Sequence, residues 1–216
     1  MDIGLYQVKY PFRKLIRFLL PLFKHSNPNW ISLALLPVGL LMAWCYWQAL
    51  AQHQNAYLLY AILLGFLRMV VATLDGLVAV TYSKSTTVGD ILNRITPELC
   101  DLLLYPTILL ALQRFDGLAL GVLTISWAIC FFGMQGAASG CPVQSVGPCG
   151  QTDRLAALLA FSGLQFLSLH FGWAVDFMTY FFLWILVGGS LTVVLRLQRT
   201  LKAAREKDAS PTESSP

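Results

Sequence analysis

The sequence predicts an all-α protein: an integral membrane bundle of six transmembrane helices with an N-terminal interfacial amphipathic helix. Two observations predict this fold class. Of the 216 residues, 56% are hydrophobic and only 12% are charged, whereas a soluble domain has roughly 25% charged residues. The apolar residues also gather into runs of spanning length, which is about 20 residues. We therefore expect one membrane domain and no second soluble domain.

The basic residues flank the apolar runs. Of fifteen Lys and Arg, five lie between Lys9 and Lys24 and five between Arg196 and Lys207. Because an excess of Lys and Arg marks cytoplasmic flanks, both termini are expected in the cytoplasm, and the protein in an inner or cytoplasmic membrane. No basic recognition domain separates the two clusters, so we expect membrane lipid as a partner and no nucleic acid.

Residues 1–26 are expected to form the interfacial segment. Between Tyr10 and Phe23, apolar residues recur at helical spacing, while Arg13, Lys14 and Arg17 occupy the opposite face. Such a helix lies on an anionic membrane surface. The alternative is a first helix that packs on soluble protein.

Residues 27–201 are expected to form the membrane domain. Polar interruptions divide it into six spans, at residues 30–51, 57 to about 80, about 90 to 112, 117 to about 132, 155 to about 170 and 175 to about 195. The polar residues 202–216 are expected to be a disordered cytoplasmic tail.

The five cysteines are an odd number, and three of them lie in apolar segments. We expect free thiols. Cys141 and Cys149 share a loop, but no His or further Cys stands at zinc-ligand spacing. A metal or disulfide role for this pair is the less favoured alternative.

One hairpin, LDGLVAVTYSKSTTVGDILNRITPELCD, concentrates the polar residues. Ionisable residues at membrane depth usually face the bundle interior or a water-filled cavity. Two interpretations stay open: a cytoplasm-facing ligand pocket, or helix packing in which Asp75 pairs with Arg68 or Arg94. The small residues of the hairpin allow a ligand or a helix to approach closely; they are Gly76, Ala79 and Gly89.

The hairpin resembles the signature of the CDP-alcohol phosphatidyltransferases, D-x2-D-G-x2-A-R-x8-G-x3-D-x3-D. Asp75, Gly76, Ala79 and Gly89 match it in register. The segment NPNWISLALLPVGLL is similar to the start of the first membrane helix in that family. The segment GPCGQTDRLAALLA is similar to its GPxGKxDR stretch, with Gln151 where Lys is usual. The resemblance covers most of the chain.

The resemblance implies transfer of a phosphatidyl or other substituted phosphoryl group from a CDP-linked lipid donor to a small alcohol acceptor, with release of CMP. It also implies Mg²⁺ or Mn²⁺ held by carboxylates and makes a homodimer unsurprising. This chain departs from the signature at four positions, where it carries Ala72, Val80, Asn93 and Pro97. Only Asp75 remains of the four motif aspartates.

If transfer occurs, other residues of the hairpin must compensate for these replacements. The metal would then be held by Asp75, Asn93 and Asp90, and Asp101 or Glu98 would act as the base. Gly76, Ala79 and Gly89 would make room for the nucleotide, and Arg94 could replace the lost arginine.

Two other functions compete with transfer. One is a catalytically degenerate homologue that binds nucleotide-lipid or a partner membrane protein. The other, a transporter or channel, is disfavoured because the charged residues gather on one hairpin instead of lining a path across the bilayer.

Overall fold

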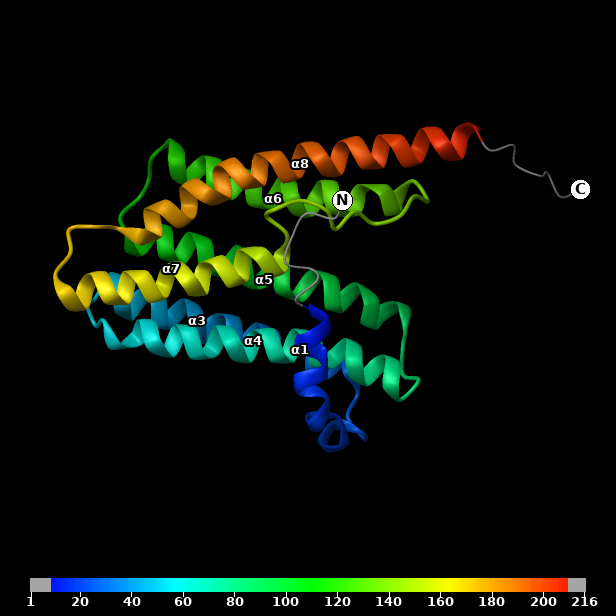
Figure 1. Ribbon diagram of the computed structural model, residues 1–216, viewed down its shortest axis with the longest axis horizontal. Helices are drawn as coiled ribbons and strands as arrows, with labels where there is room; N and C mark the ends of the chain where they lie inside the picture. The colour runs from blue at the N-terminus through cyan, green and yellow to red at the C-terminus, as the bar shows by residue number, and fades with distance from the viewer. Residues whose placement is uncertain (1–8, 210–216) are drawn as a thin grey trace, which may run out of the picture.

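The computed structural model describes residues 9–209, and their regular structure is helical (Figure 1). Five segments of this range are long and apolar enough to cross a membrane, namely Pro28–Leu50, α4, α6, α7 and α8. The protein is therefore a multi-pass membrane protein. The helices are α1 (Lys9–Ile16), η2 (Arg17–Phe23), α2 (Pro28–Leu33), α3 (Leu35–Leu50), α4 (Ala56–Thr81), α5 (Thr87–Ala111), α6 (Gly117–Ala138), α7 (Gln151–Phe171) and α8 (Phe177–Ala209).

The third predicted span corresponds to α5. This helix has 25 residues, as long as its neighbours, but its first half carries the charged residues of the hairpin, so it is not among the five apolar segments. Two prolines, Pro97 and Pro106, lie inside α5, and the helix continues through both.

The N-terminal segment is helical, but it is divided. The predicted helix over Tyr10–Phe23 changes to a 3₁₀ helix, η2, at Arg17. Pro21 explains the change, because proline lacks an N–H and its ring clashes with the carbonyl four residues earlier. Helix α1 runs across the long helices of the bundle (Figure 1). Leu15 and Phe18 are exposed, whereas Leu20 is buried against the bundle.

The first predicted span consists of two helices. Asn27 caps α2 by accepting a hydrogen bond from the backbone N of Asn29 at 2.9 Å. The α-helix is interrupted by a turn at Ala34, whose backbone angles stay in the right-handed helical region, and it resumes as α3. Pro37 accounts for this break, because it has no N–H to donate to the carbonyl of Leu33.

The connections alternate between the two ends of the bundle (Figure 1). Those between α3 and α4, α5 and α6, and α7 and α8 lie at one end. Those between α4 and α5 and between α6 and α7 lie at the other, together with the end of α8.

Helix α8 continues to Ala209, so the predicted disorder is wrong for residues 202–209. The rest of the predicted tail, 210–216, lies outside the described residues.

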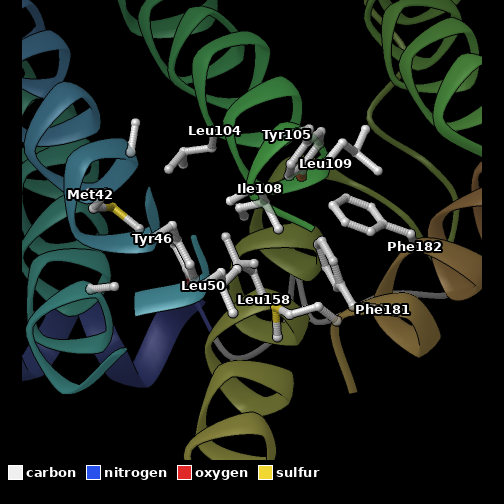
Figure 2. Close-up of a cluster of buried hydrophobic side chains, with 14 of the residues drawn as sticks. Met42, Tyr46, Leu50, Leu104, Tyr105, Ile108, Leu109, Leu158, Phe181 and Phe182 are labelled. Atoms are coloured by element: carbon white, nitrogen blue, oxygen red, sulfur yellow. The ribbon is translucent and has the colours of Figure 1, made fainter. Parts of the chain in front are cut away.

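An apolar core joins α3, α5, α7 and α8 (Figure 2). Tyr105 sets its ring edge against Phe181 and Phe182, with centroids 5.9 and 6.2 Å apart. The hydroxyl groups of Tyr46 and Ser162 lie 2.7 Å apart, which satisfies both inside the bundle. This core holds the apolar half of α5 and leaves its polar half at the end with the α4–α5 connection.

Candidate functional site

Asp75 lies on α4 facing α2, where it is 2% exposed. Its carboxylate accepts a hydrogen bond from the Ser32 hydroxyl at 2.5 Å. The other carboxylate oxygen lies 2.6 Å from the backbone N of Gly76. The two helices thus hold the remaining motif aspartate in a defined position at the hairpin.

The small residues around Asp75 have different surroundings. A methyl group built on Gly76 would be in ordinary van der Waals contact, at 3.7 Å, with the side-chain nitrogen of Asn93, so this position faces α5. The same group on Gly89 would lie 2.9 Å from the side-chain oxygen of Asn29. Gly89 therefore allows close approach of α2, whereas a methyl group at Gly76 would fit against α5 without a clash.

The two predicted bases belong to a buried network of charges. Asp101 accepts a hydrogen bond from Arg68 at 2.7 Å, and Arg68 also donates to the carbonyl of Pro97 at 2.6 Å. Glu98 accepts from Arg154 at 2.6 Å. The same Arg154 nitrogen lies 3.1 Å from the second oxygen of Asp101. Both arginines are almost completely buried.

This network joins α4, α5 and α7. Its charges balance, two arginines against two carboxylates, as buried charges require. The packing interpretation expected Asp75 to pair with Arg68 or Arg94. Arg68 forms a salt bridge with Asp101 and Arg94 forms one with Asp90, while Asp75 accepts a hydrogen bond from Ser32. A carboxylate already engaged by arginine is also poorly placed to accept a proton from a substrate.

A polar pocket of about 720 Å³ opens on the other side of α5. From α5 it is lined by Asp90, Asn93, Arg94 and Glu98. Arg94 donates to Asp90 at 3.0 Å in an exposed i, i+4 pair. The rest of the wall comes from the second half of α6, the loop after it, the first turn of α7, and Arg196 and Arg199 of α8.

Arg196 is built into the wall of this pocket. It donates to the carbonyl groups of Ile129 and Val146 at 2.5 and 3.1 Å and is only 6% exposed. A methyl group built on Gly133 would lie 2.6 Å from the guanidinium, so glycine there leaves room for it. A basic residue expected from its sequence position to flank the membrane is thus buried between α6 and α8.

The loop between α6 and α7 is packed against α8. Gly147 has φ +117° and lies so close to Thr192 that a side chain would clash. Thr192 accepts a hydrogen bond from the backbone N of Cys149 at 3.0 Å. Burial raises the pKa of the Cys149 thiol to about 12. All five cysteines are free, which confirms that expectation.

The residues predicted to hold a metal are poorly matched to that task. Asp75 is engaged with Ser32, Asp90 pairs with Arg94, and Asn93 supplies a neutral oxygen. Within residues 9–209, no group of three or more His, Cys, Asp or Glu side chains is placed to hold a metal ion. This donor set does not fit the two-metal centre that the signature implies.

Sequence reasoning missed three residues of this region: Arg154, Arg196 and Ser32. Arg154 stands in the GPCGQTDR segment, where an arginine just inside a span signals a buried partner. Ser32 had no signal, because a lone serine in an apolar helix does not reveal its contact. The predicted residues Asp90, Asn93 and Glu98 meet in the pocket, whereas Asp75 lies outside its lining.

Two comparisons relate the chain to known proteins, and a third finds no match. No family model matches it. The inner membrane protein YnbA of Escherichia coli (strain K12) is 32% identical over 152 residues, which cover 69% of this chain and 74% of that protein. The crystal structure of the Mycobacterium tuberculosis phosphatidylinositol phosphate synthase with CDP-DAG bound has a TM-score of 0.65 at 16% identity, covering 94% of this chain and 96% of that one.

The structural match extends over nearly the full length of both chains, so the bundle has the same fold as that synthase. The sequence match is strong enough to establish common family membership. The chain belongs to the family of the inner membrane protein YnbA.

Proposed function

We propose that this protein binds a CDP-linked lipid at the hairpin between α4 and α5 and holds it without the two-metal transfer chemistry of the family it resembles. The observation that carries the proposal is the set of side chains available to hold a metal ion. Asp75 is the single carboxylate at the four motif positions, and it is buried against Ser32. Binding is supported by the fold, because the synthase that shares it was crystallised with CDP-DAG.

The hairpin offers small and polar side chains for such a ligand. Gly76 faces Asn93 of α5, and Ala79 lies three residues further along α4, at the position that the signature gives to alanine. Small side chains let a nucleotide approach the backbone. We further propose that α5 is a sixth span and α1 an interfacial helix. Both termini then face the cytoplasm, where the nucleotide would enter.

Transfer to an alcohol is the second candidate. One observation favours it: Asp75 keeps its motif position, and Mg²⁺ binds in many enzymes through one or two carboxylates plus substrate phosphates. Asn93, Asp90, and Asp101 or Glu98 would then have to support metal and proton transfer. The engagement of these carboxylates by Arg94, Arg68 and Arg154 makes this candidate the weaker one.

The test combines binding and turnover on the full chain in lipid nanodiscs. CDP-diacylglycerol is expected to raise the unfolding temperature equally with Mg²⁺ and with EDTA. No CMP is expected from any acceptor in a panel of alcohols. The Gly76→Leu variant, which places a bulky side chain against Asn93, should lose the protection.

Metal-dependent CMP release that disappears in Asp75→Ala would instead establish the transferase. If neither protection nor release were observed, the hairpin would hold no CDP-linked ligand and both candidates would fail. The homodimer stays a prediction, which light scattering of the detergent-solubilised protein would check.

A further inference from the structure

We infer that Pro97 makes the backbone carbonyl group of Asn93 a binding group for the nucleoside of the CDP-linked lipid. The inference deepens the proposed function and rests on it, because it names a contact to the same ligand. It concerns the main chain of α5, whereas the role expected of Asn93 involved only its side chain. Both residues stand at positions where the signature has aspartate.

A proline inside a helix leaves one carbonyl group without its usual donor. In an α-helix, the N–H of each residue donates to the carbonyl four residues earlier. Pro97 lies inside α5 and has no N–H, so the carbonyl of Asn93 lacks the bond that any other residue at 97 would supply. A backbone carbonyl needs water or another donor in place of such a bond. Proline at this position therefore removes a carboxylate and frees an acceptor one turn earlier.

The neighbouring carbonyl groups of α5 are engaged by side chains of the protein. The hydroxyl of Thr96 donates to the carbonyl of Leu92 at 2.7 Å, and Arg68 donates to that of Pro97 at 2.6 Å. These two oxygens thus have partners inside the bundle. The carbonyl of Asn93 lies between them in the chain, and its helical donor is missing because of Pro97. It is therefore the acceptor of this turn that suits a ligand.

Asn93 lies where a ligand can reach it. The residue is partly buried and contributes to the lining of the polar pocket, so it borders open space. Its side-chain nitrogen would lie 3.7 Å from a methyl group built on Gly76, so it also faces the motif glycine of α4. The freed carbonyl thus belongs to a residue at the proposed binding hairpin, close to the glycine that follows Asp75.

A carbonyl oxygen can bind only the part of the ligand that donates hydrogen bonds. The ionised pyrophosphate of a CDP-linked lipid offers acceptors alone, and the partial negative charge of a carbonyl repels it. The nucleoside carries the donors, which are the ribose hydroxyl groups and the amino group of cytosine. The carbonyl of Asn93 therefore contacts the nucleoside, and this contact needs no metal ion.

The direct test is the NMR signal of this carbonyl, measured on the full chain in lipid nanodiscs. Asparagine labelled with ¹³C at the carbonyl and arginine labelled with ¹⁵N select the single Asn–Arg peptide bond of the chain, Asn93–Arg94. CDP-diacylglycerol should move the carbonyl resonance downfield, because the group gains a hydrogen bond. Phosphatidic acid, which carries the lipid and a phosphate but no nucleoside, should leave the resonance unmoved.

A matched pair of variants tests the role of proline. Pro97→Ala restores the N–H and lets it bond to the carbonyl of Asn93. CDP-diacylglycerol should then leave the resonance unmoved, and its affinity should fall about three- to tenfold, the size of one hydrogen bond. Pro106→Ala is the control, because it restores a bond to Leu102 in the apolar half of α5. This variant should keep the wild-type affinity and the wild-type shift.

Three results would overturn the inference: an unmoved resonance in the wild type, an equal shift with phosphatidic acid, or unchanged affinity in Pro97→Ala. If Pro97→Ala failed to fold, the wild-type resonance would still decide. Protection of the wild type by CDP-diacylglycerol against thermal unfolding separates this inference from the proposed function. Protection combined with an unmoved resonance would refute the inference alone, whereas no protection and no shift would refute both.

Discussion

The polar half of α5 serves two regions that use the same residue types differently. On one side, Asp101 and Glu98 are paired with the buried guanidinium groups of Arg68 and Arg154. On the other side, Asp90 and Arg94 pair at the edge of the open pocket with more than a third of each side chain exposed. The first region is a set of charges paired with one another, of which Glu98 also lines the pocket, and the second faces water.

This difference distinguishes the charged residues that stabilise the fold from those that are placed to bind a ligand. In a low-dielectric interior, a charge must be paired, so the inner set stabilises one arrangement of α4, α5 and α7 and offers little to a substrate. A charge beside water can exchange its partner for a ligand at small energetic cost. Glu98 and Asp101, the acidic residues closest to the lost base position at Pro97, thus belong to the region least suited to catalysis.

The prediction with the largest expected effect compares the stability that each of these two regions contributes. Arg154→Met leaves Glu98 without its buried partner and should reduce the free energy of unfolding by about 3–5 kcal/mol. The matched change Arg94→Met removes an exposed pair and should cost no more than about 1 kcal/mol. Denaturant unfolding of both variants in detergent micelles checks this. Equal losses would show that the inner set is not a buried network in the membrane.

A second substitution tests the wall of the pocket. A methyl group at Gly133 would lie 2.6 Å from the Arg196 guanidinium and 3.2 Å from the carbonyl of Gln144. Gly133→Ala should therefore reduce the free energy of unfolding by about 1–3 kcal/mol. Gly163→Ala is the matched control, because nothing lies within 4 Å of that position. The control should raise stability by up to about 1 kcal/mol. Losses of equal size would mean that Arg196 is not fixed there.

A third pair of variants tests the position of Asp75. Ser32→Ala removes the hydroxyl that donates to the carboxylate and should destabilise the protein by about 1.5 kcal/mol. Ser190→Ala removes an exposed hydroxyl that bonds within its own helix, and a change within about 0.5 kcal/mol is expected. Thermal unfolding with and without CDP-diacylglycerol measures both. If Ser32→Ala were silent, Asp75 would be held by other groups.

The fold could be predicted because the patterns that determine its helices lie within single segments of the chain. A run of apolar residues must be helical in a bilayer because its backbone groups can pair only within the segment, so five predicted spans correspond to long apolar helices. The boundary errors also have local causes. Pro21 and Pro37 divide helices that the apolar pattern treats as continuous, and α8 extends past Leu201 on residues with good helix propensity.

The site was less accessible from sequence because it depends on partners distant in the chain. Spacing placed Asp101 and Glu98 near the missing base position, but Arg154, more than 50 residues later, determines what they do. Charge counting assigned Arg196 to a cytoplasmic flank, whereas Gly133 leaves room for it inside the bundle. Such pairings are set by helix packing, which no single segment encodes.

The smallest expected effect concerns the loop that closes the pocket, and it leaves stability unchanged. If this loop is packed as firmly as the inner network, Cys149 must stay a neutral thiol. Its pKa is raised from 9.0 to about 12 by burial, so the thiolate fraction at neutral to mildly basic pH is about a thousandfold lower than in the unfolded chain. Because the pKa is higher in the folded protein, the stability that comes from burying the neutral thiol is fully present below pH 9. It is lost as the pH rises toward 12. Alkylation of Cys149 at pH 8 should therefore be slow in the native protein and fast in urea, with Cys149→Ser identifying the labelled peptide. Rapid native labelling would show that the loop opens, and the pocket would then lack a fixed wall on the side of α7.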